Sequence, residues 1–435
     1  MMLLKRTSWS ELDARARQAL LQRPACADNA GMLATVRDTL QQVRDGGDGA
    51  IAQLTRRFDK VELASSRVDD AELAQAEADL PSDSIAAIDI AIRNVRSFHA
   101  AQLPTPIAVE TMPGVHCERI SQAIDAVGLY VPAGTAPLPS AAIMLAVPAA
   151  IAGCPVRILC TPPRVDGRAD PAVLVAASRA GIRDIFKIGG AQAIAAMAYG
   201  TATVPKVNKI FGPGNAWVTL AKTLVSTDLN GAAIDMPAGP SEVLVIADAT
   251  ASPAFVAADL LAQAEHGVDS QAMLVTTSVD LANRVDTELV SQVAVLSRAE
   301  TIRAALRNSH CIVAADIDTA IEISNSYAPE HLILQIESAR SFVPRIRNAG
   351  SIFVGAWSPE SAGDYCSGAN HVLPTYGFAR AYGGLGVEHF LRHTTIQELT
   401  ANGLAALSET IVTLAELEGL DAHAAAVRVR QGANR

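Results

Sequence analysis

The hydrophobic residues of the central chain form short apolar runs that alternate with longer helical patterns. The first series has four such runs, at residues 126–131, 156–160, 184–188 and 207–211. Helical patterns follow them in turn, at residues 140–151, 171–180, 192–199 and 216–225. A second series has runs at residues 242–247, 273–276, 311–313, 332–334 and 351–354. This alternation is typical of βαβ units, so it predicts an α/β protein with two units, each built on a parallel sheet.

The two ends of the chain follow a helical pattern instead. Residues 32–58 indicate a helix interrupted at Gly46 and Gly47, and residues 404–429 indicate helix again. A lone amphipathic helix must bury its apolar face, so we expect both ends to pack on the α/β units or on another subunit. The expected division is an N-terminal helical extension (residues 1–24), a first α/β unit (25–127 with 239–380), a second α/β unit (128–238) and a C-terminal helical tail (381–435).

Composition and charge narrow the class of protein. The chain has 435 residues, of which 50% are hydrophobic and 4% aromatic, and this suits a large α/β enzyme. The net charge of -10 argues against a nucleic-acid partner, because phosphate backbones require clustered lysine and arginine. The longest apolar run, residues 141–152, is too short to span a membrane.

The N-terminal pattern and the cysteines together predict a cytoplasmic location. Residues 1–24 carry charges at helical spacing and do not resemble a secretory signal. The six cysteines are scattered and include no C-x-x-C pair: Cys26, Cys117, Cys154, Cys160, Cys311 and Cys366. Such cysteines fit reduced thiols better than a disulfide framework.

Three glycine-containing turns follow the predicted strands of the second α/β unit. They cover residues 128–134, 189–192 and 211–215. Ligands of open α/β sheets bind at this strand-to-helix edge, where helix N-termini can hold phosphate. Any one turn is equally well explained as a tight turn, but three in one unit favour a nucleotide site. Tyr130 could stack on a ring, and Gln192 and Asn215 could bond ribose or amide groups.

A candidate metal site begins on the helix predicted before Gly267. Residues three apart on a helix are neighbours, so the Gln263 amide and the His266 ring can approach one cation. The pair alone is weak evidence, because most histidines are surface or core residues, and the site depends on further ligands. Farther along, the consecutive Glu330 and His331 offer two groups for proton transfer.

Long motifs connect these features. They are Gly128–Gly134, Lys209–Asn215, Asp235–Glu242, Gln263–Gly267, Ala328–His331, Ser361–Asp364 and Asn370–Pro374. With these motifs in this order, the chain resembles the histidinol dehydrogenase family over nearly its whole length. The resemblance implies a zinc enzyme that oxidises L-histidinol to L-histidine through L-histidinal and reduces two NAD⁺, as the last steps of histidine biosynthesis. It also implies two incomplete Rossmann-like units in an aldehyde dehydrogenase-like arrangement.

The resemblance further implies roles for individual residues. One zinc per subunit would be held by oxygen and nitrogen donors from Gln263, His266, Asp364 and His423. His331 would accept the alcohol proton and later, with Glu330, activate water. The substrate contacts implied are Ser241, Gln263, His266, His331, Asp364, His371, Glu418 and His423. These metal and substrate groups belong to the first α/β unit and the tail, and the second unit would bind NAD.

The resemblance also implies a homodimer with shared active sites. Glu418 and His423 lie near the end of the helical tail. In the family picture this tail enters the active site of the partner subunit. We therefore expect the tail to be exchanged between two copies of the chain.

Several other functions are open from the residues themselves. A hydrolase built on Ser241 is disfavoured because no G-x-S-x-G motif surrounds it. A thiol-dependent aldehyde dehydrogenase could use Cys117 or Cys154, but Cys154 lies in an apolar run without a neighbouring histidine or lysine that would lower its pKa. A zinc- and NAD-dependent dehydrogenase of another small polar alcohol is a closer alternative. A non-catalytic nucleotide-binding protein would not need metal ligands and a base from distant segments.

Overall fold

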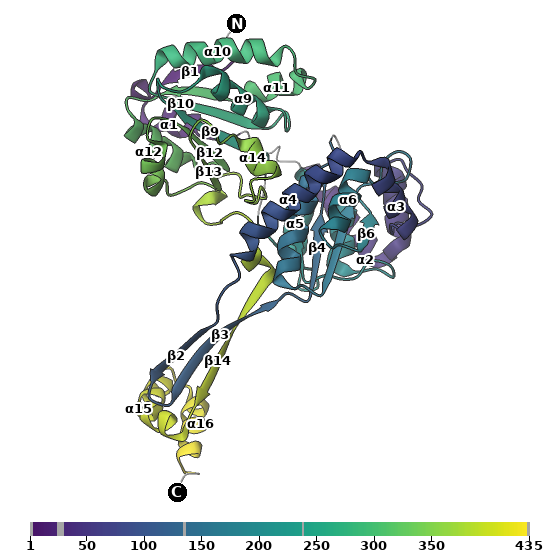
Figure 1. The fold of residues 1–435 in the computed structure, drawn as a ribbon. Coiled ribbons are helices and arrows are strands. Elements are labelled where there is room, and N and C mark those ends of the chain that lie inside the picture. The colour runs from purple at the N-terminus through teal and green to yellow at the C-terminus, as the bar shows by residue number, and fades with distance from the viewer. Residues whose placement is uncertain (1–2, 24–29, 134–135, 237–238, 433–435) are drawn as a thin grey trace.

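The computed structural model describes residues 3–23, 30–133, 136–236 and 239–432. These residues form two α/β lobes and an arm that projects away from them, with the C-terminus at the far end of the arm (Figure 1). One lobe is built on a six-stranded sheet, the other on a five-stranded sheet, and the arm on a three-stranded sheet. We call them the six-stranded lobe, the five-stranded lobe and the arm.

The six-stranded lobe has a wholly parallel sheet. Its strands, in spatial order, are β1 (Lys5–Ser8), β11 (His310–Val313), β10 (Gln271–Thr276), β9 (Glu242–Ala247), β12 (His331–Gln335) and β13 (Ser351–Val354). Alternate residues of β9 face opposite sides, because Val243 and Val245 join one core cluster and Leu244 and Ile246 join another. Both faces are therefore covered, as expected for a parallel sheet.

Helices cover both faces of this sheet. The longer ones are α9 (Pro253–Ala264), α10 (Val279–Val293), α11 (Ala299–Leu306) and α12 (Ile317–Tyr327). Shorter segments are η1 (Trp9–Glu11), α1 (Ala14–Leu20), α13 (Ala339–Phe342), η2 (Val343–Arg345) and α14 (Glu360–Tyr365). Residues 1–24 were expected to form a helical extension, but β1 pairs with β11 at the edge of the sheet. The N-terminal segment is thus part of this lobe.

The five-stranded lobe has a second wholly parallel sheet. Its spatial order is β6 (Asp184–Lys187), β5 (Val156–Thr161), β4 (Ala126–Tyr130), β7 (Lys209–Phe211) and β8 (Ala233–Ile234). The connecting helices are α5 (Pro139–Ala152), α6 (Pro171–Arg179), α7 (Gly190–Tyr199) and α8 (Ala216–Ser226). The predicted α/β class with two parallel-sheet units is confirmed.

The N-terminal helices pack on the five-stranded lobe. They are α2 (Ala30–Phe58), α3 (Asp70–Asp79) and α4 (Ser82–Ala100), and α2 bends at Gly47, where a break was expected. Helix α2 contacts α7 and α8, α3 contacts α6, and α4 contacts α5. We expected residues 25–127 to belong to the same unit as residues 239–380. The helices of this segment instead cover the five-stranded sheet. The apolar faces of these helices pack on the layer formed by α5–α8. The order of elements along the chain does not reveal which layer a helix covers.

The arm was not predicted. Strands β2 (Ile107–Met112), β3 (Val115–Ala123) and β14 (Leu391–Leu399) pair antiparallel in the order β14-β3-β2. Short helical turns η3 (Phe378–Arg380) and η4 (Val387–Phe390) precede β14. Helices α15 (Ala401–Leu417) and α16 (Asp421–Gly432) then follow it at the end of the arm (Figure 1). The tail from residue 381 was expected to be helical, but its α-helices begin only at Ala401, after η4 and β14.

Polar residues gather at one edge of the six-stranded sheet. Strands β9, β10 and β12 begin with Glu242, Gln271 and His331, and parallel strands begin at the same edge. Helix α9 runs back from β9, so its C-terminal Gln263 reaches this edge as well. Among the described helices, none is long and apolar enough to cross a membrane.

Candidate metal and proton-transfer site

Helix α9 delivers the first two candidate ligands. Gln263 is fully buried near the helix end, and neither atom of its amide has a hydrogen-bond partner among the described residues. His266 follows one turn later and is exposed, with its backbone N–H donating to the Gln263 carbonyl. A buried amide with no partner costs roughly 1–3 kcal/mol, so Gln263 is suited to a ligand that completes its bonding.

Helix α14 brings two carboxylates to the same place. An Asp364 oxygen lies 4.0 Å from Nε2 of His266, and its other oxygen lies 3.7 Å from Nε2 of His331. Glu360 precedes Asp364 by one turn and is buried, and its oxygens have no hydrogen-bond partner in the described chain. Ligand atoms of His266, Glu360 and Asp364 all lie within 4.8 Å of one another.

The electrostatics of the cluster favour a bound cation. Burial raises the pKa of Asp364 to about 7. Burial also raises the pKa of Glu360 well above its usual range, and the neighbouring Asp364 and Glu330 carboxylates raise it further. A divalent cation would offset both the burial of these carboxylates and the repulsion between them. Carboxylate, imidazole and amide groups can all serve as zinc ligands. Gln263, His266 and Asp364 therefore fit a metal site, and Glu360 adds a carboxylate that the sequence analysis missed.

Glu330 and His331 both bind the backbone of Glu242. A Glu330 oxygen accepts the Glu242 N–H at 2.9 Å, and Nδ1 of His331 lies 3.2 Å from the Glu242 carbonyl oxygen. A carbonyl can only accept, so Nδ1 carries the proton and Nε2 keeps its lone pair. Nε2 has no hydrogen-bond partner among the residues described and faces Asp364 at 3.7 Å. The ring is thus held in the tautomer that can accept a proton beside the candidate metal site.

Burial sets the charge state of both groups. Burial lowers the pKa of His331 to about 3, although the hydrogen bond to the Glu242 carbonyl opposes this shift. It also raises the pKa of Glu330 well above its usual range. The buried ring is therefore neutral at neutral pH before any proton is taken. Carboxyl oxygens of Glu330 and Glu360 lie 3.7 and 3.8 Å from Nδ1, where they can stabilise the imidazolium.

Two predicted substrate contacts lie close to this cluster. Ser241 directly precedes β9, and its carbonyl accepts the N–H of Gln271. Burial lowers the pKa of His371 to about 4, the field of His266 lowers it further, and a contact with the Ser140 backbone raises it. Ser140 belongs to α5, so His371 lies where the two lobes meet.

Glu418 and His423 do not join this cluster within one chain. Glu418 is the C-terminal cap of α15, and His423 lies on α16; both are exposed near the far end of the arm (Figure 1). The structure therefore brings together His266 and Asp364, with Gln263 near the end of the helix that precedes His266, but not His423. In the expected homodimer, His423 would have to come from the second copy.

The predicted NAD contacts all lie at the carboxyl edge of the five-stranded sheet. The Tyr130 hydroxyl accepts the N–H of Gly190, and Tyr130 is buried, which leaves no open ring face for stacking. Gln192 is buried and its amide donates to Asp59 at 3.4 Å. Asn215 caps α8 by accepting the Val218 N–H. These side chains shape the loops at that edge.

The loop before Asn215 requires glycine. Gly212 has φ +118°, and a Cβ there would lie 2.1 Å from the Tyr130 carbonyl oxygen. Asp235 accepts the Gly212 N–H, and Lys222 donates to both the Gly212 carbonyl and Asp235. The buried Lys222–Asp235 ion pair thus fixes this loop against the end of β8.

Comparison with known proteins decides the family. The histidinol dehydrogenase family model matches residues 22–431. The chain belongs to the histidinol dehydrogenase family. It is 53% identical over 422 residues to the histidinol dehydrogenase of Vibrio parahaemolyticus, with 97% of each chain covered. It is 51% identical to that of Colwellia psychrerythraea, over 97% of this chain and 98% of the relative.

A solved member of the family has the same structure. The crystal structure of histidinol dehydrogenase from Elizabethkingia anophelis is 43% identical and superposes with a TM-score of 0.96. The match covers 100% of this chain and 99% of that chain. Family membership makes the chain an oxidoreductase of histidine biosynthesis, so the enzyme class predicted from the sequence motifs is confirmed.

The surroundings of Cys154 and Cys117 do not favour a thiol-dependent aldehyde dehydrogenase. Cys154 is buried and its thiol donates to the Phe390 carbonyl at 3.6 Å. Burial raises its pKa to about 11, which favours the thiol over the nucleophilic thiolate. Cys117 lies on β3 in the arm. Cys26 lies outside the described residues.

Proposed function

We propose that this chain oxidises L-histidinol to L-histidine through L-histidinal at a zinc site, with two NAD⁺ reduced per product. One observation carries the proposal: His331 presents a free Nε2 within 3.7 Å of Asp364, beside an unpartnered Gln263 amide and His266. This arrangement joins a candidate metal site to a candidate base, as an alcohol dehydrogenation requires. Family membership supports the substrate.

Gln263, His266 and Asp364 would hold the zinc, with His423 from a second copy as the fourth ligand. Bound zinc would act as a Lewis acid that holds the amine and imidazole nitrogens of the substrate. Ser241 and His371 near the cluster, and Glu418 on the arm of the second copy, are the proposed polar contacts to the rest of the amino alcohol. Glu360 would add its carboxylate charge to the same cluster once bound zinc offsets the cost of its burial.

His331 acts as the base in the first oxidation. Its Nε2 takes the hydroxyl proton while the carbinol carbon passes a hydride to the nicotinamide, which gives the aldehyde and one NADH. The resulting imidazolium is stabilised by the Glu330 and Glu360 carboxyl groups on its Nδ1 side. The sequestered site keeps the ring neutral until the proton arrives.

Glu330 and His331 then share the second oxidation. Water must add to the aldehyde before a second hydride can leave, and the water must lose a proton as it attacks. After the imidazolium of the first step has released its proton to solvent, Nε2 of His331 can accept this proton, and Glu330, 3.7 Å from the ring, is the second group placed to relay it. Aldehyde, water and the second NAD⁺ yield the carboxylate, NADH and two protons.

The dinucleotide is proposed to bind at the carboxyl edge of the five-stranded sheet. The turns after β4, β6 and β7 meet there, with Tyr130, Gln192 and Asn215 around them. The contact between His371 and the Ser140 backbone brings this lobe next to the metal cluster. A cytoplasmic location is part of the proposal, supported by the five unpaired cysteines of the described chain.

The test combines metal analysis with turnover. Zinc per chain is measured, and NADH formation is followed with L-histidinol and with an amino alcohol that lacks the imidazole. We expect one zinc per chain, two NADH per histidine formed, loss of activity on chelation and recovery on zinc return. Zinc-loaded protein that forms no NADH from L-histidinol would contradict the proposal.

A further inference from the structure

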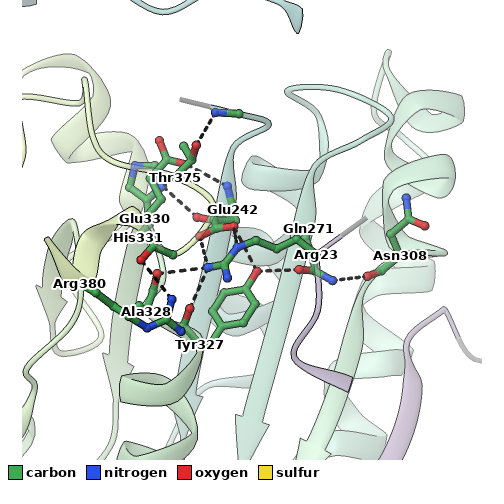
Figure 2. A network of polar contacts seen from close by, with 12 residues as sticks. Arg23, Glu242, Gln271, Asn308, Tyr327, Ala328, Glu330, His331, Thr375 and Arg380 are labelled. Atoms are coloured by element: carbon green, nitrogen blue, oxygen red, sulfur yellow. Dashed lines mark hydrogen bonds and ion pairs between the residues drawn. The ribbon is translucent and has the colours of Figure 1, made fainter. Parts of the chain in front are cut away.

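Arg23 is the centre of a buried polar network at the amino edge of the six-stranded sheet (Figure 2). Its Nε and Nη2 donate to the two carboxylate oxygens of Glu242. Nη2 also donates to the carbonyls of Tyr327 at 2.9 Å and Ala328 at 3.1 Å. The guanidinium carbon lies 4.0 Å from the centre of the Tyr327 ring. No part of the site described above accounts for this arginine.

Glu242 connects Arg23 to the proton-transfer groups. The side chain of Glu242 is held by Arg23, and the backbone of the same residue holds Glu330 through its N–H and His331 through its carbonyl. Both groups therefore take their position from one residue (Figure 2). A shift of Glu242 would move the Glu330 oxygen and the His331 ring together.

Arg23 also fixes the turn from which Glu330 and His331 emerge. The last carbonyls of a helix lack partners within the helix, and Arg23 supplies donors to two of them at the end of α12. Ala328 follows with φ 55°, a left-handed conformation that is costly for alanine and needs support from its surroundings. Pro329, Glu330 and His331 come directly after it.

The position of Arg23 is itself well determined by the N-terminal segment. Strand β1 pairs with β11 along its full length, and Leu20 and Leu21 pack against the core cluster that contains Tyr327. The Tyr327 hydroxyl donates to Gln271 at 2.7 Å, and the Gln271 amide donates to Asn308 at 2.8 Å. The network thus extends across the starts of three neighbouring strands.

We propose that Arg23 is a positioning residue for the proton transfers: through Glu242 and the end of α12 it sets the orientation of Glu330 and His331. The inference rests on the proposed function, in which His331 is the base. Arg23 contacts neither substrate nor metal in this picture. A purely stabilising ion pair is the competing explanation, and it would affect unfolding without affecting the chemistry of the folded enzyme.

The test compares Arg23→Ala and Arg23→Lys with Arg15→Ala, which removes an exposed arginine from the same segment. Each full-length variant is assayed below its unfolding temperature for kcat, KM, zinc per chain and rescue by added guanidinium. We expect Arg23→Ala to lose about 10- to 100-fold in kcat, because small misplacements of reacting groups have effects of this size. KM for L-histidinol and zinc content should change little. Lysine cannot make the forked contact, so Arg23→Lys should recover only part of the loss.

Guanidinium rescue and comparison with His331→Asn distinguish a positioning role of Arg23 from a purely stabilising one. Low concentrations of guanidinium should restore part of the kcat of Arg23→Ala and none of that of His331→Asn, while Arg15→Ala should behave as wild type. If Arg23→Ala keeps wild-type kcat while His331→Asn is inactive, Arg23 has no positioning role. Loss of kcat only in proportion to lost folded protein or zinc, without rescue, would overturn the inference as well. An active His331→Asn would instead refute the proposed base.

Discussion

Glu360 and Asp364 occupy successive turns of α14, and both carboxylates face His331, at 3.8 Å from Nδ1 and 3.7 Å from Nε2. They lie on either side of the ring that we propose as the base. Two carboxylates this close to each other and to neutral histidines are costly unless a cation or a proton compensates them. This relationship links the metal site to the proton-transfer site.

Glu360→Gln should weaken zinc binding. The change removes a carboxylate from the cluster with little change in volume, and losses of supporting groups around a metal typically lower affinity about 10- to 100-fold. Competition with a chelator measures the affinity. Glu337→Gln, which alters an exposed glutamate, is the matched control. Equal zinc affinity in Glu360→Gln and wild type would exclude Glu360 from the metal site.

Asp259→Asn should stabilise the metal-free protein at neutral pH. Burial raises the pKa of Asp259 to about 6 in the folded state, above the value of about 3.9 expected when unfolded. Between these values the folded state retains a proton that the unfolded state has lost, so stability falls as pH rises from about 4 to about 6. The neutral amide can still accept the hydrogen bond from Gln335 that Asp259 accepts at 2.7 Å.

Urea unfolding at two pH values measures this effect. At pH about 7.5 the free energy of unfolding should rise by about 1–3 kcal/mol in Asp259→Asn, and near pH 4 the variant should match wild type. A variant that is less stable than wild type at the higher pH would mean that the Asp259 charge is stabilising in the folded protein.

Chains that carry His423→Ala or His266→Ala should complement each other if the arm is exchanged. Each homodimer would lack a ligand in both sites, whereas a heterodimer would contain one intact site and one doubly defective site. An equal, fully exchanged mixture should therefore recover about a quarter of wild-type activity, since half the dimers are mixed. Heterodimers confirmed by mass that remain inactive would mean that His423 serves its own chain.

The parallel sheets were predictable because their strands are buried on both faces. Residues 242–247 are buried throughout and form an uninterrupted apolar run after Glu242, which a sequence pattern shows clearly. The arm was missed for the opposite reason. Strand β2 is exposed at every residue, and β14 is exposed at most of its residues, so neither shows the apolar alternation of a core strand.

The candidate site was predictable in part. The three-residue spacing of Gln263 and His266 at the end of a predicted helix indicated the first pair, and family motifs added Asp364, Glu330 and His331. Glu360 precedes the Ser361–Asp364 motif by one residue, and only its spacing of four from Asp364 indicates that the two share a face. Arg23 lies 219 residues from Glu242, and nothing in the local sequence links the two. Such contacts depend on how distant segments pack.

His331→Asn tests the central claim most directly. In the proposed reaction the free Nε2 of His331 takes the proton in each oxidation while other residues hold the metal. Turnover of L-histidinol should fall by about 100-fold or more, because general bases contribute about 10²–10⁴-fold, while zinc per chain stays at the wild-type value. A zinc-loaded His331→Asn enzyme that forms NADH at the wild-type rate would contradict the account.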